Sequence, residues 1–224
     1  MLLVQNAKMK KSSVSGLTVV NWTLPAFLSN TGFKTCPNAG LCATGCYART
    51  GTYRFSGSIA AHEKKLALSQ SDEFIPEMIA EIDSWLRKKS VKSLKIRIHD
   101  AGDFYNVEYT SKWFNVMAHY LQDNRVSFYA YTKQIQLFQN FKRLRLIPNN
   151  FTTIFSYGGK QDSLINPITD RNSRVFDSLD ALTSAGYIDG TLDDMVAAMG
   201  TSNRIGLVYH GAKSYVNTKW ASVA

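Results

Sequence analysis

The chain has 224 residues, of which 45% are hydrophobic and 19% charged, a composition that predicts one large folded domain over residues 1–224 and excludes wholesale disorder. No apolar run approaches the roughly 18 to 20 residues that span a bilayer, and the apolar residues of the N-terminus precede its lysines, the reverse of a secretion signal, so we expect a cytoplasmic protein without membrane contact. Lysine and arginine number 26 against 17 acidic residues, and the net charge of +9 favours nucleic acid as a partner, although the same charge suits a merely solubilising surface.

In chain order, the first predicted strand covers residues 17–24, LTVVNWTL, and ends at Pro25. A loop with three cysteines follows it. The apolar residues of segment 72–89 keep to one face of a helix, with Pro76 in its first turn, and this pattern predicts an amphipathic helix. Residues 94–98, LKIRI, alternate apolar and basic side chains, which is the period of a strand with one buried face.

The second half of the chain continues this alternation of strands and helices. An apolar stripe predicts a helix over residues 107–122, with Asn106 as its N-cap, and another predicts a helix over residues 134–145. Residues 161–200 allow only the prediction of a late strand–helix unit or a surface excursion. Runs of β-branched and aromatic residues predict further strands at residues 126–131, 151–155 and 205–209.

Strands separated by amphipathic helices imply parallel pairing with right-handed crossovers. Five or six such units suit a partial (β/α)6-type barrel better than a small doubly wound sheet. Parallel folds of this kind place their ligands at the carboxyl ends of the strands. Polar, reactive or glycine residues stand directly after the predicted strands, as His99-Asp100-Ala101-Gly102-Asp103, Thr132-Lys133, Ser156-Tyr157-Gly158-Gly159-Lys160 and His210-Gly211.

The loop after the first strand carries Cys36, Cys42 and Cys46 in a C-x5-C-x3-C pattern. An odd number of cysteines within eleven residues does not resemble a disulfide framework, and thiolates are soft ligands that favour zinc, copper(I) or an iron–sulfur cluster. The loop has no two-residue knuckle and only three thiols, which favours a cluster over zinc. A zinc site completed by His99 or His62, and three merely structural cysteines, remain as alternatives.

Three thiolates around a [4Fe–4S] cluster leave one iron without a cysteine ligand. That iron could bind water, a side chain such as His99 or Asp100, or a chelating small molecule. Loss of that iron would instead leave a three-iron cluster.

Several blocks of the sequence carry a resemblance to a known family. The stretch TCPNAGLCATGCYARTGTYRF, followed by AAHEKKLAL, IRIHDAGDFYN, FYAYTK and IGLVYHGAK, resembles the phage-encoded gene product eighty-eight type over nearly the whole chain. The resemblance implies a viral protein, located in the cytoplasm of the host cell. That family is in turn distantly similar to the radical S-adenosylmethionine (SAM) enzymes, which have a (β/α)6 partial barrel with a three-cysteine [4Fe–4S] loop after strand one.

The similarity to radical SAM enzymes implies roles for particular residues. Cys36, Cys42 and Cys46 would be the cluster ligands, and SAM would chelate the unique iron. The segment with His99, Asp100, Gly102 and Asp103 would take the place of the motif that binds the SAM amino group, and Ser156 with Tyr157 would lie where the ribose is met. Two departures from the radical SAM pattern bear on SAM cleavage more than on cluster binding. The usual cysteine spacing is C-x3-C-x2-C with an aromatic residue before the last cysteine, and aspartates stand where a glycine pair and a glutamate are usual.

Two functions from different classes therefore compete. The first is an iron–sulfur protein of radical SAM-like fold, with or without SAM-dependent radical chemistry on an unknown substrate. The second is a nucleic-acid-binding or host-takeover protein with a structural metal loop, indicated by the charge and by aromatics among bases at Tyr129, Tyr131, Lys133, Tyr157 and Lys160. A cysteine-nucleophile hydrolase is a third interpretation, and it would leave two of the cysteines unexplained.

Overall fold

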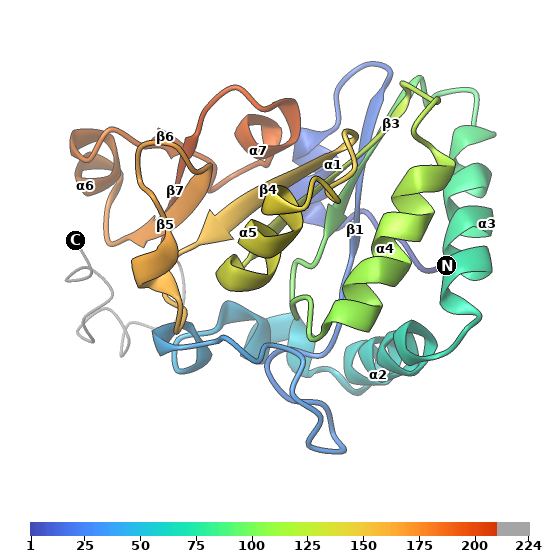
Figure 1. Ribbon diagram of the computed structural model, residues 1–224, viewed down its shortest axis with the longest axis horizontal. Coiled ribbons are helices and arrows are strands. Elements are labelled where there is room, and N and C mark those ends of the chain that lie inside the picture. Colours follow the sequence, from blue (N-terminus) through green and yellow to red (C-terminus); the bar gives the residue numbers. More distant parts are fainter. Residues whose placement is uncertain (210–224) are drawn as a thin grey trace.

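Seven parallel strands form one curled sheet, and residues 1–209 are the part of the chain that this computed structural model describes (Figure 1). The strand order is β1-β2-β3-β4-β5-β7-β6, and every neighbouring pair is parallel. The curl makes a half barrel, so the predicted partial barrel is confirmed. The strands are β1 (Leu17–Trp22), β2 (Ser93–Ile98), β3 (Val126–Thr132), β4 (Phe151–Ser156), β5 (Asn172–Phe176), β6 (Ile188–Asp189) and β7 (Arg204–Val208).

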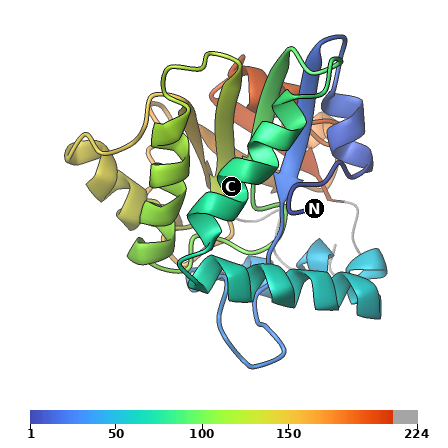
Figure 2. The same ribbon diagram turned by 90° about the vertical axis from the view of Figure 1, so that its right-hand side faces the viewer.

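Helices cover both faces of this sheet. On one face α3 and α4 lie side by side (Figures 1 and 2), whereas α1 contacts β1, and α7 contacts β3, from the other face. The α-helices are α1 (Ala7–Ser12), α2 (Ser56–Gln70), α3 (Phe74–Leu86), α4 (Val107–His119), α5 (Ile135–Arg143), α6 (Leu179–Ser184) and α7 (Met195–Met199). Short 3-10 turns are η1 (Leu41–Ala43), η2 (Tyr47–Arg49), η3 (Gly51–Arg54) and η4 (Asp162–Leu164).

The two faces of the sheet differ because successive side chains of a strand point to opposite sides. We call the side covered by α3 and α4 the outer face, where Ile96 and Phe128 pack with Trp113 of α4 in the larger apolar cluster. We call the other side the inner face, where Met9 of α1 and Ala197 of α7 complete a smaller apolar cluster. Because burying one large apolar side chain stabilises a fold by roughly 2 kcal/mol, the outer face supplies most of the hydrophobic stabilisation.

The elements predicted from periodicity are present in the structure. Strands predicted at 17–24, 94–98, 126–131, 151–155 and 205–209 correspond to β1, β2, β3, β4 and β7, and helices predicted at 72–89, 107–122 and 134–145 correspond to α3, α4 and α5. The Asn106 side chain caps α4, since its Oδ1 accepts a hydrogen bond from the Tyr109 amide at 2.8 Å. Pro76 lies in the first turn of α3.

Elements without a clear hydrophobic period are missing from the prediction. In α2 the buried residues include Lys65 and Ser69, so no apolar stripe marks that helix. The two residues of β6 are both exposed, and β5 begins with two polar residues. Segment 161–200 thus contains β5, α6, β6 and α7 rather than a bare surface excursion.

The carboxyl ends of the strands meet at one rim of the half barrel. The register pairs Trp22 with Ile98, Ile98 with Ala130, and Thr132 with Phe155, so the residues that follow β1 to β4 come to similar heights. The predicted rim residues His210 and Gly211 lie outside the described residues. None of the helices within residues 1–209 has the length and apolarity needed to cross a bilayer.

Candidate functional site

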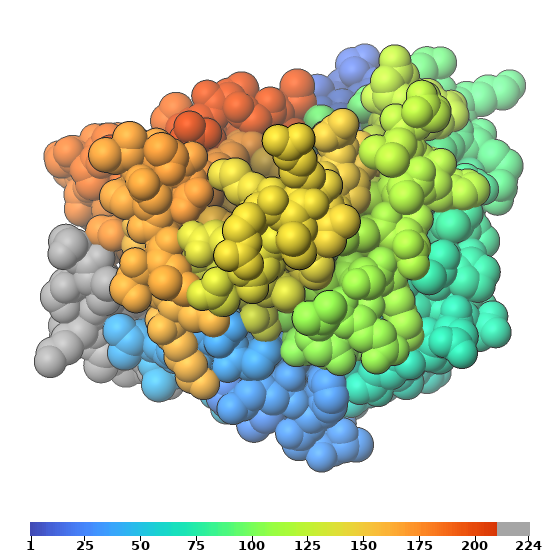
Figure 3. Space-filling view, in the orientation of Figure 1, coloured from blue at the N-terminus to red at the C-terminus, as the bar shows by residue number. Residues whose placement is uncertain are grey.

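The cysteine loop connects β1 to α2 and is bound to the rim at the end of β4. The amides of Gly40 and Cys42 donate to the Gly158 carbonyl at 3.3 and 3.1 Å, and the Lys160 amide donates to the Asn38 carbonyl at 2.9 Å. A side chain at position 40 would meet the backbone, because its Cβ would lie 2.9 Å from the Gly159 carbonyl carbon. In the space-filling view the blue segment after β1 runs along the lower surface, below the green and yellow helices (Figure 3). Glycine in this loop therefore permits its close approach to β4.

Every predicted site residue lines one cavity of about 660 Å³ at this rim. The three cysteines are free and partly buried. A cavity of this size is in the range of small-molecule sites. The predicted residues on its wall are Cys36, Cys42, Cys46, His99, Asp100, Gly102, Asp103, Ser156 and Tyr157. The structure thus brings them together, and their roles as ligands stay predictions.

Two of the thiols in this cavity, Cys36 and Cys46, are held in their neutral form. Burial raises the pKa of Cys36 to about 12, and the negative charges of Asp103 and ionised Cys46 add to that rise. Burial also raises the pKa of Cys46, with Cys42 acting in the same direction and Lys133 opposing it. A cysteine nucleophile needs a lowered pKa, so these two thiols do not fit the hydrolase interpretation. A bound cation would reverse the balance, because metal binding deprotonates its thiol ligands.

Among residues 1–209, no three His, Cys, Asp or Glu side chains are grouped closely enough to hold a single metal ion. His62, one of the two histidines named for a zinc site, does line the cavity. Its ring lies 5.9 Å from that of Tyr53, and burial lowers its pKa.

Asp100 joins three parts of the chain at the cavity wall. Its carboxylate accepts hydrogen bonds from the Tyr53 hydroxyl at 2.9 Å, the Asn6 amide group at 3.1 Å and the Thr23 hydroxyl. Its backbone carbonyl accepts a hydrogen bond from the hydroxyl of Tyr47, the residue directly after the third cysteine. Asp100 therefore fixes the cysteine loop to the end of β2 through neutral donors.

Asp103 connects the ends of β2 and β3. Its carboxylate accepts hydrogen bonds from the Thr132 hydroxyl at 2.6 Å and from the amides of Phe104 and Lys133 at 2.8 and 2.9 Å. Burial nevertheless raises the pKa of Asp103. The preceding Gly102 has φ +84, and a Cβ there would lie 2.6 Å from the Leu24 side chain, so the turn requires glycine.

His99 is turned by a positive φ of 67° toward the aromatic cluster of the outer face. Its Nε2 lies 2.9 Å from the Tyr109 hydroxyl, which in turn accepts a hydrogen bond from Trp22 Nε1 at 2.9 Å. The hydroxyl can either donate to or accept from Nε2, depending on the tautomer of the ring, and within residues 1–209 the buried Nδ1 of His99 has no hydrogen-bond partner. Burial, with Arg97 adding to it, lowers the pKa of His99 to about 3, so the ring is neutral.

Ser156 and Tyr157 stand at the end of β4 beside two basic residues. The Ser156 hydroxyl accepts a hydrogen bond from Lys133 Nζ at 2.7 Å. The Arg174 guanidinium lies 4.3 Å from the centre of the Tyr157 ring. Of the two basic residues, Lys133 lines the cavity and brings positive charge to this part of its wall.

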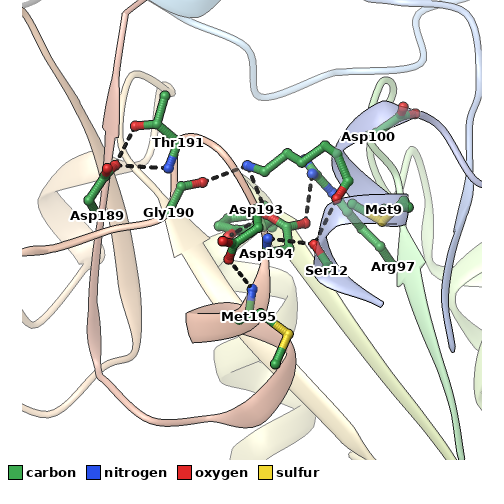
Figure 4. A network of polar contacts seen from close by, with 12 residues as sticks. Met9, Ser12, Arg97, Asp100, Asp189, Gly190, Thr191, Asp193, Asp194 and Met195 are labelled. Carbon is green, nitrogen blue, oxygen red and sulfur yellow. Dashed lines mark hydrogen bonds and ion pairs between the residues drawn. The ribbon is translucent and has the colours of Figure 1, made fainter. Parts of the chain in front are cut away.

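A buried ion cluster on the inner face, absent from the sequence-based prediction, lies beside the same cavity (Figure 4). Asp194 is fully buried and pairs with Lys8 Nζ at 2.9 Å and with Arg97 Nη1 at 2.8 Å. Its oxygens also accept a hydrogen bond from the Tyr129 hydroxyl at 3.0 Å, and its amide donates to Ser12 Oγ at 2.7 Å. Although burial acts in the opposite direction, Arg97 and Lys8 hold the pKa of Asp194 below its usual value.

One part of this cluster had a signal in the sequence. The alternation in LKIRI places Arg97 on the face opposite Ile96 and Ile98, which is the inner face. Asp194 had no such signal, because segment 161–200 shows no period that places a residue inside.

Comparison with known proteins gives one match. The family model described as Gene product 88 matches residues 1–219 and so extends over every described element. No curated protein and no solved structure matches the chain. The similarity to radical SAM enzymes has no support in these comparisons and stays a hypothesis.

Proposed function

Since the chain belongs to the Gene product 88 family, a phage-type family whose description names no activity, we propose its function from the cavity itself. We propose an iron–sulfur protein that holds a [4Fe–4S] cluster on Cys36, Cys42 and Cys46. The observation that supports this most is that three thiols from one short loop line a single cavity at the carboxyl ends of parallel strands.

The chemistry of the donor set fits a cluster better than a single ion. A tetrahedral zinc ion needs four ligands that converge on one point, whereas a cluster spreads its thiolate ligands over separate iron atoms. The raised pKa values of Cys36 and Cys46 also fit, because a cationic cluster would supply the positive charge that these buried thiols lack.

The fourth iron would remain open toward the cavity. The His99 ring packs edge-on against Phe104 in the aromatic cluster of the outer face, and its Nε2 is engaged by the Tyr109 hydroxyl. Asp100 already accepts three hydrogen bonds from neutral side chains. We therefore favour a small molecule at that iron, and SAM is the candidate that the sequence resemblance names. A cluster with an open iron, when bound, supplies an electron to a chelated ligand.

The residues of the chain would then position that ligand and shield it. Asp100, Gly102 and Asp103 form the wall after β2, and Ser156 and Tyr157 form the wall after β4. The hydrogen bonds from the loop to Gly158 and from Tyr47 to Asp100 hold the thiols over this space.

The net charge of +9 still favours the nucleic-acid alternative. Two of the aromatic side chains predicted for its binding surface, however, lie inside the fold. Tyr129 and Tyr131 point their hydroxyls at Asp194 on the inner face, and Tyr129 is 2% exposed. Side chains in that position are not available to stack on bases.

The test is purification of the full chain without oxygen, followed by measurement of iron, zinc, acid-labile sulfide and the absorbance spectrum. We expect a brown protein with about four iron atoms per chain and no iron in a variant with all three cysteines changed to serine. A matched control is Thr44→Ser, an exposed position in the same loop, which should keep its iron.

A colourless protein that is free of iron, and equally stable with serine at the three positions, would sink the proposal. Zinc in place of iron would favour the structural metal loop. Formation of 5′-deoxyadenosine after addition of SAM and dithionite would support SAM chemistry, whereas no product and no spectral change would restrict the proposal to a cluster alone.

A further inference from the structure

Two cations on the inner floor of the cavity pair with the same buried carboxylate. Lys8 and Arg97 both line the cavity, and both pair with Asp194, one at each carboxylate oxygen. Asp194 is fully buried, and the Lys8 and Arg97 side chains are 24% and 10% exposed. Two cations thus share one anion in a place where water does little to screen them.

Arg97 also has a donor without an acceptor. Within residues 1–209, its hydrogen bond to Asp194 uses Nη1, while its buried Nε has no partner. The plane of the guanidinium is held beside the Tyr131 ring, 5.0 Å from its centre. A buried unsatisfied donor costs about 1 to 3 kcal/mol, so a fixed, unpaired guanidinium edge beside a cavity calls for an explanation.

The other carboxylate on this part of the wall does not provide that acceptor. Asp100 takes its hydrogen bonds from neutral side chains, and within the described part of the chain it forms no ion pair with Arg97. Burial lowers the pKa of Lys8 and Arg97 adds to the lowering, whereas Asp194 and Asp193 oppose it. The Lys8 Nζ also donates a hydrogen bond to the Gly190 carbonyl at 2.7 Å.

We infer that Arg97 and Lys8 form an anion subsite, which binds the carboxylate or phosphate group of a small molecule held in the cavity. Guanidinium edges bind planar carboxylates and phosphates through two parallel hydrogen bonds. Such a group would satisfy Nε and balance the second cation, with Lys8 alongside. The inference concerns what the cavity binds, and it does not depend on the cysteine loop holding a cluster.

The experiment follows the Arg97 Nε–Hε signal by NMR in the full, ¹⁵N-labelled chain. The signal is assigned by its loss in Arg97→Lys and is then followed during separate titrations with potassium acetate and potassium phosphate, with potassium chloride at equal ionic strength as the baseline. We expect a saturable shift of this signal with at least one oxyanion and none with chloride. Whichever of acetate and phosphate binds with the higher affinity identifies the group that the subsite recognises as a carboxylate or a phosphate.

Lys8→Met provides a second measurement in which both residues of the Arg97–Asp194 pair are kept. We expect this variant to bind the oxyanion about tenfold more weakly, the loss of roughly one charge-assisted contact. Lys10→Met, an exposed lysine on the same helix, is the matched control and should bind like the unmodified chain.

Three results would overturn the inference: no shift beyond that seen with chloride, equal shifts of all arginine signals, or equal affinity in Lys8→Met and the unmodified chain. A chain that is purified without oxygen, holds no iron and still shows the saturable shift would refute the cluster and leave the anion subsite standing.

Discussion

The two faces of the same sheet are built on opposite chemistry. On β2, Ile96 and Ile98 enter the apolar cluster of the outer face, while Arg97 between them enters an ion cluster on the inner face. The outer face is stabilised by removal of apolar surface from water, which depends little on direction. The inner face depends on particular pairs of charged groups, whose burial is costly unless each is paired.

This difference separates stability from binding. The outer face is filled by packed apolar side chains that hold the fold together, whereas the inner face and the rim gather the charged and reactive side chains around one cavity. We therefore expect substitutions on the outer face to change the free energy of unfolding without changing what the cavity binds. Substitutions of the ion cluster should change both.

The largest effect should come from the centre of the outer face. Trp113 is fully buried, and its ring lies 5.2 Å from that of Phe74 and 6.1 Å from that of Trp22. Trp113→Ala should lower the free energy of unfolding by about 4 kcal/mol, because it leaves a large cavity. Urea denaturation measures the loss, and Trp113→Phe should lose less. A loss below about 1 kcal/mol would contradict the division between the two faces.

The second prediction concerns the centre of the inner face. Asp194→Asn removes the carboxylate with which both Lys8 and Arg97 pair, and breaking a buried pair in this way typically costs about 3 kcal/mol. The same substitution removes the carboxylate that competes for Arg97, so the oxyanion signal shift should saturate at a lower concentration. Asp177→Asn, at an exposed carboxylate outside the ion cluster, serves as the control. Unchanged stability together with unchanged oxyanion affinity would show that the ion cluster has no such role.

The outer face and the cysteine loop could be predicted from patterns within short segments of the sequence. The inner face could not, because its ion pairs join residues that are far apart in the sequence. The stripe of α4 and the spacing of Cys36, Cys42 and Cys46 are visible within short segments. The pairing of Lys8 with Asp194 joins residues from the two ends of the chain, and no local period indicates it. Predicting the rim positions of Asp100 and Ser156 required only that parallel strands end together. The hydrogen bonds that occupy Asp103 and His99 depend on tertiary packing that the sequence does not display.

The third prediction uses His99, which lies between the two faces. Its pKa is lowered to about 3 in the folded chain by burial and by Arg97, whereas the unfolded chain has an ordinary value near 6.5. The unfolded state therefore binds more protons as the pH falls below about 6.5, and stability should be lost from there downward. Between pH 7 and pH 5 the loss should be about 2 kcal/mol, since one pKa unit corresponds to roughly 1.4 kcal/mol.

Thermal or urea unfolding over this pH range measures the effect of His99. His99→Gln should flatten the dependence, because glutamine does not titrate. His62 is half-buried and also has a lowered pKa, so His62→Gln is the comparison variant and should retain the steeper part of the slope. A slope unchanged by His99→Gln would mean that the imidazole is protonated or exposed in the folded protein.

The smallest expected effect lies at the start of α4, where the outer face meets the rim. The Asn106 side chain accepts a hydrogen bond from the Tyr109 amide, and loss of such a cap costs about 1 kcal/mol. Asn106→Ala should lower the free energy of unfolding by that amount, while Asn106→Asp, which keeps the accepting oxygen, should lose less. Neither variant removes a group from the cavity wall, so iron content and the oxyanion shift should stay as in the unmodified chain. The contradicting result is that Asn106→Ala reduces iron content or oxyanion binding while Asn106→Asp does not. In that case the helices of the outer face control the shape of the site, and stability and binding are not separate.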